Sequence, residues 1–352
     1  MSLGYIVSCI AYHAPALENQ LNPLPLTLAL GPYDHTRDVT DGTVRVEGVQ
    51  LRTLDLPIEE IFYRFTLHRE WDISEMSMAK YIALRSQDDS SIMALPVFIS
   101  RAFRHSMFYV REGAAIRRPE DLQGKRIGVP EWAQTASVYG RGYLSDYVGL
   151  KLADIEWIQA GVNEPGRSEK VKLKLPNGIR YRNVPDRSLN DLLLKGEIDA
   201  IMTARPPAAL GQGIVRLMPD AQAAEEKYFR DTSIFPIMHA LVIKGSVLES
   251  HPWVGMNLYK AFSEAKKRSI ERLSDITASH APMAWMTEYA ARMRSIFGED
   301  FFPYGIGAGR GGDINRATLQ AFLKFGFEQG VCHRLLDVEE LFPRQLLASY
   351  KV

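Results

Sequence analysis

Apolar and polar positions along the chain switch between a two-residue and a helical period, which predicts an α/β protein. Residues 26–31 (LTLALG) and 49–56 (VQLRTLDL) read as short strands, the second because apolar and polar residues alternate along it. Residues 57–71 (PIEEIFYRFTLHREW) place apolar residues at helical spacing, and the acidic pair in the first turn suits the helix dipole. Residues 72–87 continue as a strand that passes into a helix. This alternation is typical of an α/β domain.

A second unit of the same kind follows. RIGVP (126–130) reads as a buried strand whose end leads into a helix over residues 131–149, and residues 188–204 read as a helix, a glycine stop and a strand. Between them, the Asn-Gly pair at 177–178 predicts the turn of a hairpin. Long amphipathic helices are then expected at 251–273 and 315–330.

Two apolar stretches flank the second unit, FRHSMFYV before it and PIMHALVI after it. Because the chain would enter and leave through them, we predict a first domain built from residues 1–110 plus 240–352 and an inserted second domain of residues 111–239. Inserted domains of this kind close on ligands by hinge motion. The expected architecture therefore has two interdomain crossovers and a ligand site in a central cleft.

Three cationic side chains lie in or just before the first flanking stretch. Residues 98–112 (FISRAFRHSMFYVRE) read as a buried strand that includes Arg101, Arg104 and His105. Buried charges need partners, so either acidic side chains such as Asp72 or Glu75 or an acidic ligand must neutralise them. If the segment is extended, Arg101 and His105 share a face and Arg104 points to the other. We predict that one of the two arginines binds a ligand carboxylate, because a guanidinium can hold it with two parallel hydrogen bonds.

Other candidate ligand residues lie where predicted strands end, the usual edge for ligands in open α/β sheets. Ser74 and Glu75 close one strand, and Ser74 is either a helix cap or a ligand contact. Glu131 and Thr135 follow RIGVP. His239 lies between apolar runs and is either a satisfied core histidine or a cleft residue.

The remaining candidates have equally open interpretations. Arg141 and Arg205 either face the cleft or are surface charges. Asp34 and His35 form either an acid and base pair in a first helical turn or simply a turn.

Composition limits the class of ligand. The chain has 352 residues, 46% hydrophobic and 24% charged, so it is long enough for two domains with a sizeable core. Its 42 basic residues offset 42 acidic ones, and no net field favours a nucleic acid or an anionic membrane as partner. No stretch approaches the roughly 20 apolar residues of a membrane helix. The expected partner is a small molecule held by local charge, and a homo-oligomer is left open.

The cysteines, the opening residues and the glycine run give no sign of a zinc site, a disulfide framework, an export signal or a dinucleotide site. Cys9 and Cys332 lie at opposite ends without metal-ligand spacing, so neither a zinc site nor a disulfide framework is indicated. The opening residues 1–16 have no Lys or Arg before their apolar run, so we read no export signal and expect a cytoplasmic protein. GAGRGG (307–312) fits a dinucleotide pattern, but it does not follow a convincing strand and is interpreted as a loop.

Together these segments resemble the 4,5-dihydroxyphthalate decarboxylase family, and the likeness covers nearly everything after Leu26. The motifs that carry it are YDHT (33–36), WDISEMSMAKYIAL (71–84), PVFISRAFRHSMFYV (96–110), DLQGKRIGVPEWAQTA (121–136), NEPGR (163–167), LLLKGEIDA (192–200) and IFPIMHALVI (234–243). Two features depart from the family: YDHT stands where a basic YDRT is expected, and GIGAGRGGD (305–313) is longer than the family's link.

The resemblance implies a type II periplasmic-binding-protein-like fold and a carboxy-lyase. The implied reaction is the non-oxidative decarboxylation of a hydroxylated aromatic dicarboxylate, 4,5-dihydroxyphthalate to protocatechuate. Such chemistry needs cations for the carboxylates, a proton donor near neutral pH and a base for a hydroxyl. The residues expected to supply these are Arg101 and Arg104 as cations, His105 or His239 as donor, and Glu75, Asp34 or His35 as base.

Two points stay open at this level. A catecholic substrate is compatible with a divalent metal ion, yet no ligand spacing in the sequence names its residues. The alternative function is a solute-binding or sensor protein that holds a small carboxylate without altering it, because one scaffold can host both functions.

Overall fold

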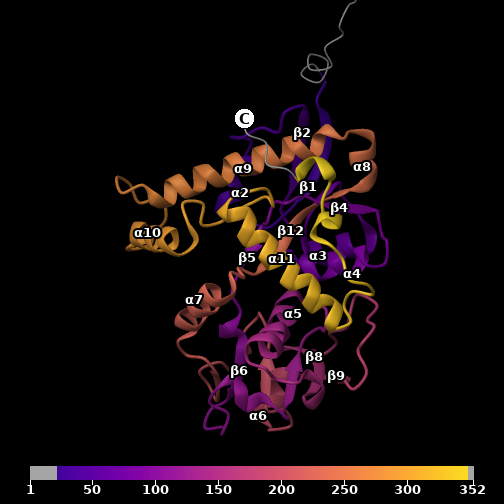
Figure 1. The fold of residues 1–352 in the computed structure, drawn as a ribbon, viewed down its shortest axis with the longest axis vertical. Helices are drawn as coiled ribbons and strands as arrows, with labels where there is room; N and C mark the ends of the chain where they lie inside the picture. Colours follow the sequence, from indigo (N-terminus) through magenta and orange to yellow (C-terminus); the bar gives the residue numbers. More distant parts are fainter. Residues whose placement is uncertain (1–21, 348–352) are drawn as a thin grey trace, which may run out of the picture.

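The computed structural model describes residues 22–347, and these residues form two β-sheets. The first has the strand order β2-β1-β3-β12-β4, with β5 paired to β12, and lies in the upper half of Figure 1. The second has the order β11-β6-β10-β7-β8-β9 and lies in the lower half. The expectations for Cys9 and for an export signal concern residues outside this described range.

The strands and helices have the following bounds. The first sheet contains β1 (Leu24–Ala29), β2 (Val49–Leu54), β3 (Ile73–Ser77), β4 (Ile92–Ala94), β5 (Ser100–Arg101) and β12 (Ile237–Lys244). The second contains β6 (Phe108–Arg111), β7 (Arg126–Val129), β8 (Glu156–Gly161), β9 (Arg180–Ser188), β10 (Ala200–Met202) and β11 (Ile214–Arg216). The helices are α2 (Asp34–Thr40), α3 (Ile58–His68), α4 (Met78–Arg85), α5 (Thr135–Gly142), α6 (Leu189–Leu194), α7 (Ala221–Thr232), α8 (Gly245–Ser250), α9 (Trp253–Ser274), α10 (Met286–Phe297) and α11 (Arg310–Glu328).

Strand direction gathers polar side chains at one edge of the first sheet. β2, β1 and β3 run parallel, so their carboxyl ends lie at the same edge. β12 runs antiparallel to β3 and places His239 opposite Ser77. The segment after β1, the end of β3 and the start of β12 therefore meet, as predicted for a ligand-binding edge.

The chain crosses between the sheets twice, which confirms the predicted two-domain architecture. The first crossing leads from β5, which pairs with β12, to β6, which pairs with β10. One turn of 3-10 helix (His105–Met107) lies in this crossing, so the single strand predicted over residues 98–112 is wrong. The two ends of that stretch bond to different sheets, and the strand must break between them. The second crossing runs from β11 through α7 to β12.

The exact domain boundaries remain a proposal. We propose that the inserted domain spans residues 111–239, a range that begins at the last residue of β6 and takes in α7 and the first three residues of β12. Residues 1–110 and 240–352 would then form the discontinuous first domain.

The hairpin predicted around Asn177 and Gly178 is also wrong. A hairpin needs antiparallel neighbours, whereas β8 and β9 pair in parallel. The Asn-Gly pair forms a turn that leads into β9. The long connection over residues 162–179 returns the chain to the edge of the sheet at which β8 and β9 begin. It also contributes side chains to the cleft.

Helix α11 braces both halves of the molecule and runs between them in Figure 1. Its Phe322 stacks on Tyr139 of α5 with ring centroids 4.5 Å apart. The glycine-rich residues 305–312 reach into the first turn of α11. Glycine is needed at position 312 because a Cβ there would lie 1.7 Å from the carbonyl oxygen of Gly307. Residues 310–312 already belong to the helix, so the glycine run is a loop only as far as Gly309.

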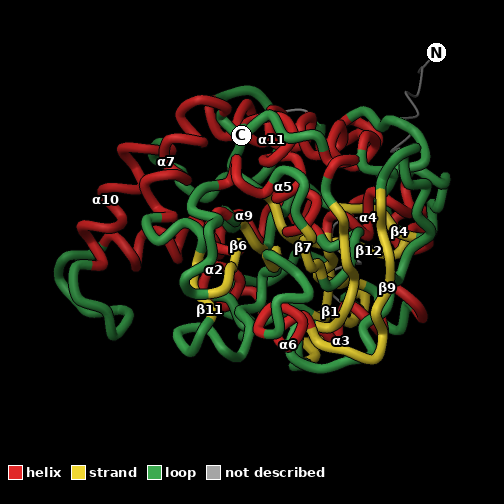
Figure 2. The backbone as a smooth tube through the Cα atoms, turned by 90° about the horizontal axis from the view of Figure 1, so that it is seen from below, coloured by secondary structure: helices red, strands yellow, loops and turns green. Residues whose placement is uncertain are grey.

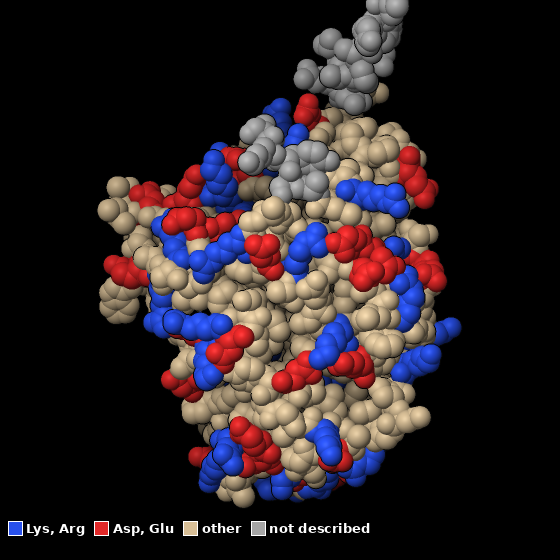
Figure 3. Space-filling view, viewed as in Figure 1, with Lys and Arg blue, Asp and Glu red and all other residues tan. Residues whose placement is uncertain are grey.

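The surface agrees with the balanced composition. Acidic and basic side chains are interspersed over the face shown in Figure 3. At one side of the molecule α7 and α10 lie together in Figures 1 and 2, joined by an ion pair between Glu226 and Arg292. Within residues 22–347, every helix is too short or too polar to cross a bilayer.

Candidate active site

A cavity of about 440 Å³ lies between the elements of the two sheets. Its polar and aromatic lining residues are Glu59, Phe62 and Thr66 of α3, Ser77 and Lys80 at the junction of β3 and α4, Arg104 of the first crossing, Glu131, Gln134 and Thr135 after β7, Arg167 and Lys170 of the long connection, Arg205, and His239 of β12. Both halves of the chain contribute, so this cavity is the predicted central cleft. A larger hollow of about 690 Å³ is lined by Pro23 and residues 39–42 and 44–51 alone, and lacks such convergence of groups from distant elements.

His239 is fixed in the cleft wall by two contacts. Its Nδ1 lies 2.6 Å from Oε1 of Glu75, and its ring packs edge-on against Phe62 with centroids 4.8 Å apart. Glu75 itself is fully buried behind the histidine. Because Nδ1 is engaged, Nε2 is the ring nitrogen left for a ligand.

Arg104 lines the same cleft without a carboxylate partner. Its Nε donates to the sulfur of Met238 at 3.3 Å, and within residues 22–347 no acidic side chain lies within ion-pair distance of it. Burial lowers the pKa of Arg104, and the more distant charge of Glu225 only partly offsets this. A largely buried guanidinium in this state is suited to bind an anionic ligand.

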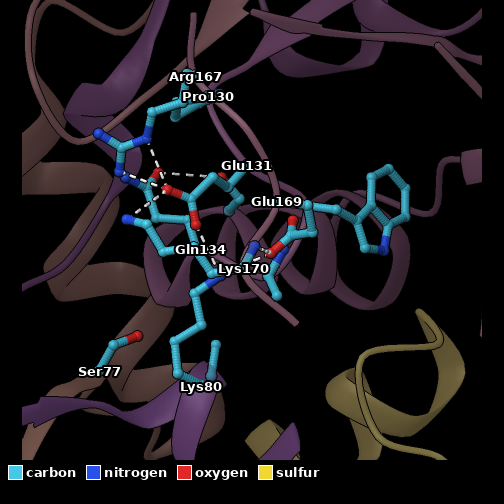
Figure 4. A network of polar contacts seen from close by, with 12 residues as sticks. Ser77, Lys80, Pro130, Glu131, Gln134, Arg167, Glu169 and Lys170 are labelled. Atoms are coloured by element: carbon cyan, nitrogen blue, oxygen red, sulfur yellow. Dashed lines mark hydrogen bonds and ion pairs between the residues drawn. The ribbon is translucent and has the colours of Figure 1, made fainter. Parts of the chain in front are cut away.

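The other cations of the cleft are paired, most of them around Glu131 (Figure 4). Lys80 Nζ lies 2.7 Å from Glu131 Oε2 and 2.7 Å from Glu169 Oε1. Arg167 lies 2.6 Å and Lys170 3.4 Å from Glu131 Oε1. Burial alone would raise the pKa of Glu131, but the three cations more than offset this and lower it to about 2. Glu131 therefore stays ionised and joins the two sides of the cleft.

Two further contacts cross the cleft. The hydroxyl groups of Ser77 and Thr135 lie 2.8 Å apart, and Thr135 also accepts the N–H of Ala79 at 3.1 Å. Arg205 pairs with Glu59 of α3. The structure thus brings Glu131, Thr135 and Arg205 into the cleft as predicted lining residues, each already held by protein partners.

The two other arginines singled out from the sequence lie away from the cleft. Arg101 donates to the carbonyl oxygens of Phe235 at 2.9 Å and Pro303 at 2.8 Å, and burial lowers its pKa to about 9. Arg141 stacks over Trp132 at 3.7 Å and donates to Gln329 at 2.8 Å, and burial again lowers its pKa to about 9. Their guanidinium groups hold the interior together.

Four further candidates also lie outside the cleft lining. His105 is wedged between two tyrosine rings, and burial lowers its pKa to about 4. His35 packs on Phe302 at 4.8 Å between centroids, and burial lowers its pKa to about 4 as well. Asp34 bonds Ser269 and pairs with residues of α9 and α2. Ser74 is fully buried, and its hydroxyl donates to the carbonyl of Glu75 at 2.9 Å.

Sequence reasoning missed several lining residues, chiefly Phe62, Lys80, Arg167 and Lys170. A signal existed for two of them, because Lys80 lies in SEMSMAKY and Arg167 in NEPGR, both motifs that carry the family resemblance. Lys80 also follows Ser77 by three residues at the start of a helix, where side chains face the strand end. Phe62 and Lys170 had no such signal.

Comparison with known proteins finds close relatives. The chain is 37% identical over 336 residues to the 4,5-dihydroxyphthalate decarboxylase of Comamonas testosteroni, an alignment that covers 94% of this chain and 100% of that one. It is 39% identical over 223 residues to the enzyme of the same name from Pseudomonas putida, covering 62% of this chain and 85% of that one. No family model matches the chain.

A solved structure shares the fold. The periplasmic aliphatic sulphonate-binding protein SsuA from Escherichia coli superposes with a TM-score of 0.53 over 93% of this chain and 99% of its own, at 12% identity. This likeness confirms the predicted binding-protein architecture.

The Glu131 network makes stability depend on acid pH. Because the pKa of Glu131 is about 2 when folded against a usual 4.5, its contribution is fully present above pH 4.5 and is lost as pH falls towards 2. Glu131→Gln should lower the free energy of unfolding at pH 7 by about 3 kcal/mol, since three cations lose their shared partner. Urea denaturation should show this deficit shrinking between pH 5 and pH 2.

Glu164→Gln is the matched control, because Glu164 is an exposed residue of the same long connection. It should leave the stability unchanged at both pH values. A deficit for Glu131→Gln that is equally large at pH 7 and pH 2 would contradict the ion-pair assignment.

Proposed function

Since the chain belongs to the 4,5-dihydroxyphthalate decarboxylase family, we propose that it converts 4,5-dihydroxyphthalate to protocatechuate with release of CO₂. The observation that carries the proposal at the level of the site is that Arg104 and His239 line the same cleft. Within residues 22–347 Arg104 has no carboxylate partner and contacts Met238, and His239 is held by the buried Glu75. A residue suited to bind an anion and a residue suited to donate a proton thus line one cleft.

The reaction requires protonation before carbon–carbon cleavage. Direct loss of CO₂ from the ring would leave a strongly basic aryl anion. The hydroxyl para to the departing carboxylate can instead feed electrons into the ring while an acid protonates the carbon that bears the carboxylate. The bond to the carboxylate then breaks, its electrons restore the aromatic ring, and CO₂ leaves.

We assign the two main roles to residues of the cleft. Arg104 binds the carboxylate that the product retains, with two parallel hydrogen bonds. His239 delivers the proton from Nε2, and Glu75 at Nδ1 stabilises the imidazolium form. Phe62 offers an aromatic face beside His239 for the substrate ring.

The base for the phenolic proton needs a different residue from those expected. Glu75 is buried behind His239, and Asp34 and His35 lie outside the cleft lining. Glu131 is committed to three cations. Among the described lining residues this leaves Glu59 of α3, a half-exposed carboxylate paired with Arg205, as the proposed acceptor of the proton.

Within residues 22–347 no group of three or more His, Cys, Asp and Glu side chains is arranged to hold a metal ion. We also propose that the protein acts in the cytoplasm, where the buried free thiol of Cys332 stays reduced.

Binding without turnover is the alternative function. It has weaker support, because the likeness to a binding protein is 12% identity whereas the decarboxylases share 37% and 39%. Incubation with 4,5-dihydroxyphthalate, followed by assays for CO₂ and protocatechuate, decides between them. Saturable binding of the dihydroxyphthalate without product would overturn the proposed reaction.

His239→Asn should reduce kcat by roughly 10²- to 10⁴-fold with little change in KM, because it removes the titrating proton and keeps some hydrogen bonding. The matched control is His105→Asn, which lies outside the cleft lining and should keep most of the activity. Steady-state kinetics on both variants give the answer. Near-normal turnover by the His239 variant would remove this histidine as the donor.

Arg104→Met and Arg101→Met should separate binding from stability. Arg104→Met should raise KM by roughly two decades while the melting temperature stays close to that of the wild type, because the lost contact is to the ligand. Arg101→Met should instead lower the free energy of unfolding by about 2 to 3 kcal/mol, because buried carbonyl oxygens lose their donor. Equal, small effects on KM from both changes would contradict the anion site at Arg104.

A further inference from the structure

The carboxylate of Glu75 is held by donors from three separate positions of the chain. The N–H of Gly31 donates to Oε2 at 2.9 Å, and the hydroxyl of Tyr33 donates to Oε1 at 2.7 Å. Nδ1 of His239 lies 2.6 Å from the same Oε1. Within residues 22–347 no Lys or Arg pairs with this fully buried group. Its described partners are therefore one imidazole, one hydroxyl and one backbone N–H.

The sheet topology places these donors on both sides of the carboxylate. β3, which carries Glu75, lies between β1 and β12. Gly31 and Tyr33 follow the end of β1, whereas His239 belongs to β12. The hydrogen bonds thus fix Glu75 across the sheet, against rigid neighbours on each side.

Tyr33 is built to donate. Burial, and next the charge of Glu75, raise the pKa of Tyr33 well above its usual value, so its hydroxyl keeps its proton. Its ring is seated against Gly31, where a Cβ would lie only 2.9 Å from Cε2 of the tyrosine. The glycine therefore both donates to the carboxylate and admits the ring that supplies the second donor.

We propose that Tyr33 is a positioning residue for His239. Its hydroxyl holds Oε1 of Glu75 at bonding distance from Nδ1, and the imidazole then presents Nε2 to the cleft. Tyr33 is absent from the cleft lining, so it acts through Glu75 and not on the substrate. This inference rests on the proposed function, in which His239 delivers the proton.

Loss of the Tyr33 hydroxyl should disturb the donor histidine and leave the anion site intact. Oε1 keeps a single donor, the carboxylate gains freedom to rotate, and the imidazole loses its fixed orientation. Arg104, which binds the substrate, is untouched by the change. The effect should therefore fall on kcat and not on KM.

The first test compares Tyr33→Phe with Tyr63→Phe. The Tyr33 variant should lose about tenfold in kcat with KM within about twofold, the size expected for one hydrogen bond to a charged group. Tyr63 is half exposed on α3, so its variant should match the wild type. A Tyr33→Phe enzyme with wild-type kcat would overturn the inference.

The second test reads the histidine directly and needs no turnover. In the free wild-type enzyme, the Nδ1 proton of His239 should give a far-downfield proton NMR signal, because its hydrogen bond is short. The signal should move or broaden in Tyr33→Phe and stay in place in Tyr63→Phe. A lowered kcat with an unmoved signal would make Tyr33 merely structural and overturn the proposal.

The two levels of the account can fail separately. A wild-type enzyme that does not turn over the dihydroxyphthalate overturns the proposed function. The NMR signal of His239 would still report whether Tyr33 positions Glu75 against the histidine. Should Tyr33→Phe fail to fold, Gly31→Ala displaces the same ring and keeps its hydroxyl. It must then move the same signal, and an unmoved signal overturns the inference.

Discussion

The shape of the cleft depends on the ion pairs that Lys80, Arg167 and Lys170 make with the carboxylate of Glu131. Lys80 reaches it from α4, beside the first sheet, and Arg167 and Lys170 reach it from the connection between β8 and β9. Three cations around one buried carboxylate would be unstable without it, and the carboxylate would be unstable without them. The network therefore sets the distance between the two sides, and the cleft takes its shape from that distance.

Charge pairing also explains which residue is left for a ligand. Lys80, Arg167, Lys170 and Arg205 all have carboxylate partners, whereas within the described chain Arg104 has none. Arg104 lies in the segment between β5 and β6, where strand pairing is interrupted. In the proposed function an anionic ligand supplies the missing partner, and His239 lines the same cleft. A scaffold that binding proteins use for capture can in this way support proton transfer.

The elements of the fold were largely readable from the sequence, whereas their partners were not. Period-two and helical patterns identified β1 to β3, β7 and α9, because burial alone produces those patterns. They could not show that β8 and β9 run parallel, since strand direction leaves no mark on apolar alternation, and a turn signal suggested a hairpin. The stretch over residues 98–112 looked like one strand for the same reason, although its ends belong to different sheets.

Site residues followed the same division. The positions of Glu131 and Thr135 at the cleft could be predicted because both residues follow a strand end, and His239 was a candidate because it lies between two apolar runs. Arg101 looked equally suited to a ligand, but one of its partners, Asn315, is 214 residues away in sequence. This contact could be recognised only in the tertiary structure.

A crystal structure of the complex with phthalate tests the central claim most directly. Phthalate keeps both carboxylates and lacks the hydroxyls that drive the reaction, so it should bind unchanged. The account predicts one carboxylate on the guanidinium of Arg104, the ring against Phe62, and the carbon bearing the other carboxylate beside Nε2 of His239. Phthalate bound with its carboxylates on Arg167 and Lys170, away from His239, would contradict it.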